Sequence, residues 1–263
     1  TLSPGETYII VASGLVSGTG YNPLQPFSLE VFSAAREAAS INGNTDVLVY
    51  HGSTDAPTVD VVETLVTGGL TIVDDASYSD FAGYLQLQTA DYRIEVRDAT
   101  GSVTVKSYEA PLATLGLQNA ALTVLASGFL NPAQNSNGAS FGLFVALPSG
   151  GDLIPLPESS ARVQVIHNSP DAVASAVDVY LNGALLIDDF GFRTASPFID
   201  APAAVGISVG IAPSNSTSSA DIIASFNYTL AAGETYIIVA SGLVSGAGYN
   251  PLQPFSLEVF SGA

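Results

Sequence analysis

Two short segments each place a histidine, a serine and an aspartate within five residues. The two sets are His51, Ser53 and Asp55, and His167, Ser169 and Asp171. A serine hydrolase uses these residue types: the histidine takes the serine proton and the carboxylate orients the histidine. Three residues so close along the chain cannot converge around a substrate, because a triad needs its nucleophile on a strained turn and its base held by a third group. We therefore predict no catalytic residue, and a hydrolase using His167 and Ser169 is the less favoured alternative.

The favoured interpretation of both sets is a structural turn where a strand ends. Histidine, serine and aspartate side chains bond to backbone groups in such turns, and here an Asx-type turn would precede Pro57. The predicted structural motif comprises His51, Ser53, Asp55, Pro57 and Asp60 in the first copy, and His167, Ser169, Pro170, Asp171 and Asp178 in the second.

Paired carboxylates also recur in both copies, as Asp74-Asp75 and Asp188-Asp189. Calcium favours clustered carboxylates together with carbonyl oxygens. The chain has no D-x-D-x-D-G loop, and adjacent aspartates on a strand point to opposite faces. Solvated charges at strand edges are therefore the favoured interpretation, with calcium as the alternative. We predict no cofactor and no metal-ligating residue.

Composition excludes several functional classes. Six basic residues face 24 acidic ones, which gives a net charge of −18 and disfavours nucleic acid and anionic membranes as partners. Cysteine is absent, so no disulfide framework or thiol nucleophile is available. No apolar run reaches the ~18 residues of a membrane-spanning helix. Methionine and tryptophan are absent too, and so few oxidisable side chains suit long exposure outside a cell.

The chain begins with a copy of its own ending. Residues 1–35 and 229–263 differ at only four of 35 positions, at an offset of 228 residues. Such a faithful repeat is typical of tandem arrays, which are mostly structural or adhesive. We therefore predict that residues 1–35 are the last two strands of a preceding module.

A more diverged repeat divides the rest of the chain. VLVYHGSTDAPTVDV at 47–61 matches VQVIHNSPDAVASAVDV at 163–179. We predict two homologous modules, 46–150 and 162–263, of ordinary domain size. Residues 36–45 are the predicted first linker, and residues 151–161 are a second, proline-containing linker that acts as a semi-extended spacer.

Within each module, apolar residues alternate with polar ones. Leu85 and Leu87 alternate with Gln86 and Gln88, and Val47 and Val49 follow the same period of two. Turn signals such as Asn182-Gly183 follow about every ten residues. No amphipathic helix reaches three turns. The pattern predicts an all-β chain of tandem antiparallel immunoglobulin-like β-sandwiches.

The second copy resembles a known bacterial family. V-x-x-I-H-N-S-P-D-A followed by A-V-D-V-Y-L-N-G, at Val163–Gly183, resembles domain of unknown function 4397. The later Ala232-Gly233-Glu234-Thr235-Tyr236 also fits its pattern, whereas the first copy departs from it at Thr54 and at Val62-Glu63. The resemblance covers both modules. It implies a secreted or surface β-sandwich, often in tandem, and no known reaction.

An isolated two-stranded hairpin is marginal in water, so the apolar face of residues 1–35 needs a cover. Either strands upstream in the same polypeptide supply it, which we favour, or the segment enters a neighbouring chain by strand exchange. The leading hypothesis is a non-enzymatic extracellular or cell-surface structural protein, a filament, stalk or fibre whose partners are copies of itself, head-to-tail or in tandem. The alternative is an adhesin or a carbohydrate- or protein-binding module that uses the loops at 131–137 or 246–250.

Overall fold

The computed structural model describes residues 2–262, so Thr1 and Ala263, the outermost residues of the long repeat, lie outside it. The chain divides into two compact units, Thr1–Glu158 and Ser159–Ala263. Strands dominate both units, and the described helices are three short 3-10 turns, η1 (Pro132–Gln134), η2 (Ala172–Ala174) and η3 (Ser219–Asp221). None of the helices described is long and apolar enough to cross a membrane.

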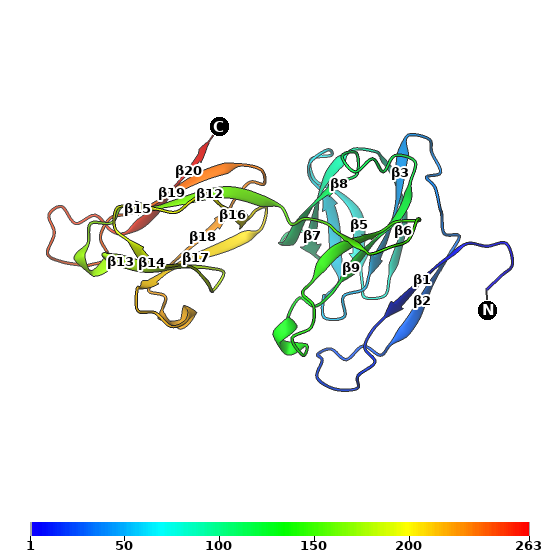
Figure 1. Ribbon diagram of the computed structural model, residues 1–263, viewed down its shortest axis with the longest axis horizontal. Coiled ribbons are helices and arrows are strands. Elements are labelled where there is room, and N and C mark those ends of the chain that lie inside the picture. Colours follow the sequence, from blue (N-terminus) through cyan, green and yellow to red (C-terminus); the bar gives the residue numbers. More distant parts are fainter. Residues whose placement is uncertain (1, 263) are drawn as a thin grey trace. The chain divides into compact units, whose positions relative to one another are not determined.

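The first unit holds a β-hairpin followed by a complete sandwich (Figure 1). Its strands are β1 (Tyr8–Ser13), β2 (Ser28–Ser33), β3 (Asn44–His51), β4 (Val59–Glu63), β5 (Leu70–Ala76), β6 (Phe81–Gln88), β7 (Asp91–Asp98), β8 (Thr104–Pro111), β9 (Ala121–Ser127), β10 (Gly142–Ala146) and β11 (Ile154–Pro155). Among the described strands, β1 pairs with β2 alone, and the sandwich consists of the sheets β11-β10-β9-β3-β6 and β5-β4-β7-β8.

The second unit repeats the sandwich. Its strands are β12 (Ser160–His167), β13 (Ala176–Leu181), β14 (Ala184–Gly191), β15 (Thr194–Ala195), β16 (Ile199–Pro202), β17 (Gly206–Pro213), β18 (Ala224–Thr229), β19 (Thr235–Ser241) and β20 (Ser256–Gly262). One sheet has the order β15-β12-β19-β20 with β16 also on β12, and the other has the order β14-β13-β17-β18. The predicted tandem immunoglobulin-like sandwiches are confirmed.

Each sandwich contains one parallel pairing in its otherwise antiparallel sheets. β3 lies parallel to β9, and β12 lies parallel to β19. A parallel pair needs a long crossover, which the strands of the opposite sheet supply here. The first strand of each sandwich is therefore held by the strand that opens its final hairpin.

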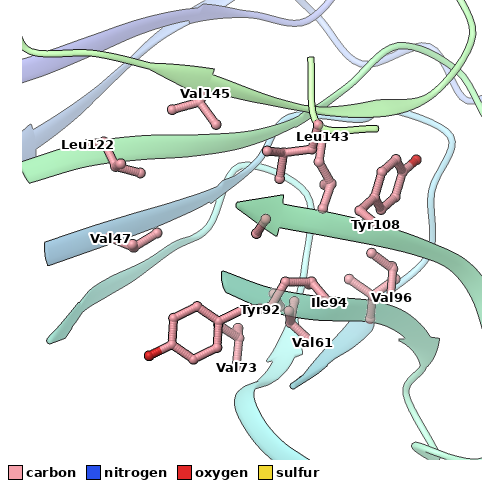
Figure 2. Packing of buried hydrophobic residues seen from close by; sticks show 14 of the residues in the cluster. Val47, Val61, Val73, Tyr92, Ile94, Val96, Tyr108, Leu122, Leu143 and Val145 are labelled. Carbon is pink, nitrogen blue, oxygen red and sulfur yellow. The ribbon is translucent and has the colours of Figure 1, made fainter. Parts of the chain in front are cut away.

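The alternating pattern of the sequence becomes the core between the sheets. Figure 2 shows Val47, Leu122, Leu143 and Val145 from one sheet of the first sandwich, and Val61, Val73, Tyr92, Ile94, Val96 and Tyr108 from the other. Fully burying a side chain of this size contributes ~1.5–3 kcal/mol. The second sandwich has an equivalent core, which includes Val163, Val179, Ile238 and Leu257.

Both segments predicted as linkers make contacts with the first sandwich. β3 begins at Asn44, and Arg36 reaches back to Asp46, with 2.6 Å between Nη1 and Oδ2. In the second segment, β11 pairs with β10 and Leu156 is buried in the first core. Prolines are tolerated in an edge strand such as β11, and apolar residues between them gain by burial.

Candidate functional site

In the second unit, the His-Ser-Asp turn is tied to the backbone. His167 Nε2 lies 2.8 Å from the carbonyl oxygen of Ala174, and its Nδ1 accepts the Ser169 N–H at 3.3 Å. Nε2 therefore carries the proton. The Ser169 hydroxyl donates to the carbonyl oxygen of Gly242 at 2.6 Å rather than to the histidine. Burial lowers the pKa of His167, although the bond to Ala174 opposes this. Because the Ser169 hydroxyl donates to a backbone carbonyl oxygen, it forms no nucleophile-base pair with His167.

Asp171 clasps the loop between β19 and β20. Its carboxylate accepts the Ser245 N–H at 2.6 Å, the Ser245 hydroxyl at 3.0 Å and the Tyr249 hydroxyl at 3.0 Å, and it caps η2 through the Val173 N–H. Burial on its own would raise the pKa of Asp171, but these hydrogen bonds lower it to about 2. We call Asp171, Ser245 and Tyr249 the loop clasp. Pro170, between Ser169 and Asp171, is exposed.

The first unit has an equivalent arrangement. His51 Nε2 lies 3.2 Å from the carbonyl oxygen of Pro57, and the Ser53 hydroxyl donates to the Gly128 carbonyl at 2.7 Å. Burial lowers the pKa of His51. Asp55 accepts hydrogen bonds at 2.9 Å from the Leu130 and Asn131 backbones and from the Asn135 side chain. Sequence reasoning missed these loop partners of Asp55, because they lie about 75 residues away along the chain.

Asp60 and Asp178 each hold a bulge in the neighbouring strand. Asp60 Oδ1 accepts the Asp75 N–H at 2.9 Å, and Asp178 Oδ1 accepts the Asp189 N–H at 3.0 Å. Asp75 and Asp189 have left-handed φ angles of 51° and 50°. A buried carboxylate therefore stabilises an otherwise unfavourable backbone conformation on each β-bulge.

This bulge corrects the expectation that adjacent aspartates point to opposite faces. The left-handed residue breaks the alternation, so one oxygen each from Asp178, Asp188 and Asp189 lies within 4.8 Å of the others. Burial and the two neighbouring charges raise the pKa of Asp188. Three such oxygens are fewer than the six to eight that calcium takes. Solvated carboxylates stay the favoured interpretation, and calcium stays an untested alternative.

The hairpin β1-β2 lies on the outer face of the first sandwich (Figure 1). The Phe32 ring centroid is 5.2 Å from that of Phe81 and 5.8 Å from that of Tyr84, whose hydroxyl accepts the Arg36 N–H at 2.8 Å. The loop of the hairpin is held as well, since Tyr21 stacks on Phe129 with centroids 5.6 Å apart. Aromatic pairs of this kind contribute ~0.5–1.5 kcal/mol beyond the area they bury.

A groove of about 790 Å³ runs along β1, between the hairpin and the outer face of the sandwich. The whole of β1 lines one side, and Tyr50, Thr123, Leu125, Leu147 and Leu153 are among the residues opposite. Within residues 2–262, β1 pairs with no strand other than β2, so its other edge carries unpaired backbone groups. The groove falls within the size range of ligand sites and lies beside an open strand edge.

The comparisons with known proteins identify one family model. The model described as "Domain of unknown function (DUF4397)" matches residues 45–174 and 161–255. No curated protein matches the chain.

Solved structures resemble the chain only distantly. A family 26 carbohydrate-binding module from Eubacterium rectale Amy13K, in complex with maltoheptaose, is 10% identical, with 83% of this chain and 97% of that one covered and a TM-score of 0.24. A proposed cell adhesion protein from Bacteroides eggerthii is 11% identical, with 86% and 97% covered and a TM-score of 0.22. Matches this distant carry no argument about function.

Proposed function

This chain belongs to the DUF4397 family, and from that premise we propose that it is a non-enzymatic extracellular structural protein. Its sandwiches would be units of a filament, stalk or surface fibre, located outside the cell or on its surface. The acidic charge of −18 and the absence of cysteine, methionine and tryptophan support that location.

The observation that carries the proposal is the docked hairpin. Residues 1–35 repeat the sequence of the final hairpin of a module, and they pack on the next sandwich through Phe32, Tyr21 and the Arg36 backbone. In an array, the last hairpin of each module would brace the module that follows. Such a joint fixes the angle between neighbours more firmly than a flexible linker does.

The chemistry of the two repeated turns supports a non-enzymatic role. Both histidine rings are buried, and Nε2 of each lies within hydrogen-bond distance of a backbone carbonyl oxygen. Both serine hydroxyls donate to backbone carbonyl oxygens. A hydrolase would need one of these hydroxyls free for its base.

Cryo-electron microscopy of the native material tests this proposal. We expect ordered filaments in which successive sandwiches keep a constant angle. The Phe32→Ala variant should widen the distribution of that angle, because it removes the aromatic contact with Phe81 and Tyr84. Independent, freely jointed particles in the unsubstituted protein would contradict a structural role.

The second candidate function is adhesion, and the groove of about 790 Å³ along β1 favours it. An extended sugar or peptide could lie between the hairpin and the sheet. A glycan array tests this reading: binding that Leu125→Asp in the groove abolishes, and Val66→Asp on an exposed loop elsewhere leaves intact, would favour the adhesin.

A further inference from the structure

The repeated hairpin sequence occurs in two different environments. In the second unit, Ile238 and Leu257 face the core and are 3% and 8% exposed. Their copies in the first hairpin, Ile10 and Leu29, are 50% and 61% exposed. Ile10 pairs with Val31, which is also exposed, so these side chains share one apolar face. This face is buried wherever the hairpin belongs to a complete sandwich.

The hairpin already has the conformation that a complete sandwich requires. The Leu15 N–H donates to Gln25 O at 2.8 Å, as that of Leu243 does to Gln253 O. Gly14 and Gly242 have φ angles of 80° and 84°, and in each case an added Cβ would lie 2.2 Å from a proline carbonyl oxygen. Docking would therefore require little rearrangement of the hairpin.

The loop of the hairpin carries half of a loop clasp. Ser17 and Tyr21 are the copies of Ser245 and Tyr249, which bind Asp171 in the second unit. In the first unit, the Ser17 hydroxyl donates to a neighbouring backbone carbonyl, and the Tyr21 hydroxyl has no hydrogen bond within residues 2–262. The missing member is the aspartate of a His-x-Ser-Pro-Asp turn.

The free edge of β1 shows where a further strand would pair. β19, the copy of β1, pairs in parallel with β12, and Gln164 lies opposite Ile237. The corresponding partner of Gln164 on β1 is Ile9. The unpaired edge of β1 borders the groove, so a strand added there has space beside the sandwich.

We propose that the hairpin of residues 1–35 docks into the sandwich formed by residues 159–228 of a second copy of this chain. The hairpin takes the place of that copy's residues 229–263. β1 pairs in parallel with β12 of the second copy, the apolar face of Ile10 and Leu29 closes its core, and its Asp171 completes the clasp with Ser17 and Tyr21. This inference rests on the proposed structural role and names the contact through which copies join.

A disulfide formed between two copies tests the docking, because the chain has no native cysteine. One full-length copy carries Ile9→Cys. The other carries Gln164→Cys and a protease site in the 231–232 turn between β18 and β19. The second copy is cleaved after folding, freed of its final hairpin in denaturant, and refolded with an excess of the first. Neighbouring strands lie about 4.8 Å apart, within the usual Cα separation of a disulfide, so we expect a covalent heterodimer.

Variants of the first copy distinguish docking from random oxidation. Leu29→Asp places a carboxylate in the core of the second copy and should lower the disulfide yield about tenfold. Ser33→Asp is the matched control, because its copy Ser261 is exposed in the complete sandwich, and it should leave the yield unchanged. Equal yields for the two variants would overturn the proposal.

A synthetic peptide of residues 229–263 shows whether the opened sandwich can accept a hairpin. If the peptide restores the native circular dichroism of the cleaved copy while Ile9→Cys yields no heterodimer, the docking proposal is wrong. That result would leave the proposed structural role intact, because bracing by Phe32 does not involve this face. Disordered particles under the microscope together with a heterodimer would instead reject the filament and keep the contact.

Discussion

Asp171 joins the His-Ser-Asp turn to the loop between β19 and β20, so its protonation makes the stability of the fold depend on pH. Its ordinary pKa of 3.8 falls to about 2 in the folded protein, since hydrogen bonds to the charged form outweigh burial. A folded-state pKa below the unfolded value contributes stability above pH 3.8, and this contribution is lost as the pH falls through about 2. The free energy of unfolding should therefore fall more steeply between about pH 4 and pH 2 in the unsubstituted protein than in Asp171→Asn. Parallel urea titrations check this, and identical slopes would contradict it.

His167 links stability to a higher pH range. Burial lowers the pKa of His167 below the ordinary 6.5. As the pH falls below 6.5, the unfolded chain therefore binds this proton more readily than the folded chain does. Its contribution to stability is complete above pH 6.5 and declines as the pH falls below that value. His167→Gln keeps a donor toward Ala174 without titrating, so its stability should change less between about pH 7 and pH 5. Equal pH profiles in thermal unfolding would exclude this explanation.

Substitution of His167 also tests whether this residue has a structural or a catalytic role. His167→Ala leaves the Ala174 carbonyl without its donor and should cost ~1–3 kcal/mol in chemical denaturation. Ester hydrolysis should be equally absent in the unsubstituted protein and in this variant. Turnover that is lost in His167→Ala would revive the hydrolase alternative.

At the scale of elements, the two copies of the hairpin provide a matched pair for measuring the joint. Phe32 packs on Phe81 and Tyr84, whereas its copy Phe260 is 53% exposed. Phe32→Ala should speed amide exchange in β1 and β2 about tenfold, from the loss of roughly 1–2 kcal/mol of aromatic contact. Phe260→Ala should leave exchange in β19 and β20 nearly unchanged. Hydrogen exchange with mass spectrometry measures both, and equal effects would mean that the joint is not held by this ring.

Local sequence signals predicted the elements well and their partners poorly. Alternation at Val47 and Val49 and the Asn182-Gly183 turn led to the sandwich fold, because periods and turns are local properties. The contacts of Asp171 with Ser245 and Tyr249 could not be predicted in this way, since only the folded loop brings them together. The burial of Leu156 within the predicted linker 151–161 could not be predicted locally either, because it depends on the surface beneath that residue.

At the scale of the whole molecule, the net charge of −18 opposes contact between copies. Screening length falls from about 30 Å at 0.01 M salt to about 8 Å at 0.15 M. Association of copies should therefore strengthen with sodium chloride over that range, as measured by light scattering. Potassium chloride should act equally, because screening depends on ionic strength and not on the identity of the cation. Association that weakens with added salt would show that attractive ion pairs dominate the contact.

The order of strands in the second sandwich also determines how it would respond to a pulling force. Arg162 lies opposite Thr235, and Thr235 lies opposite Gly262, so the chain enters and leaves the sandwich at the same end of one sheet, two strands apart. Tension between these points acts along the hydrogen bonds that join neighbouring strands, so these bonds break one after another. A force parallel to the strands would instead load all of the bonds at once in shear. A thread of such modules would resist bending at its braced joints and still lengthen under a strong pull.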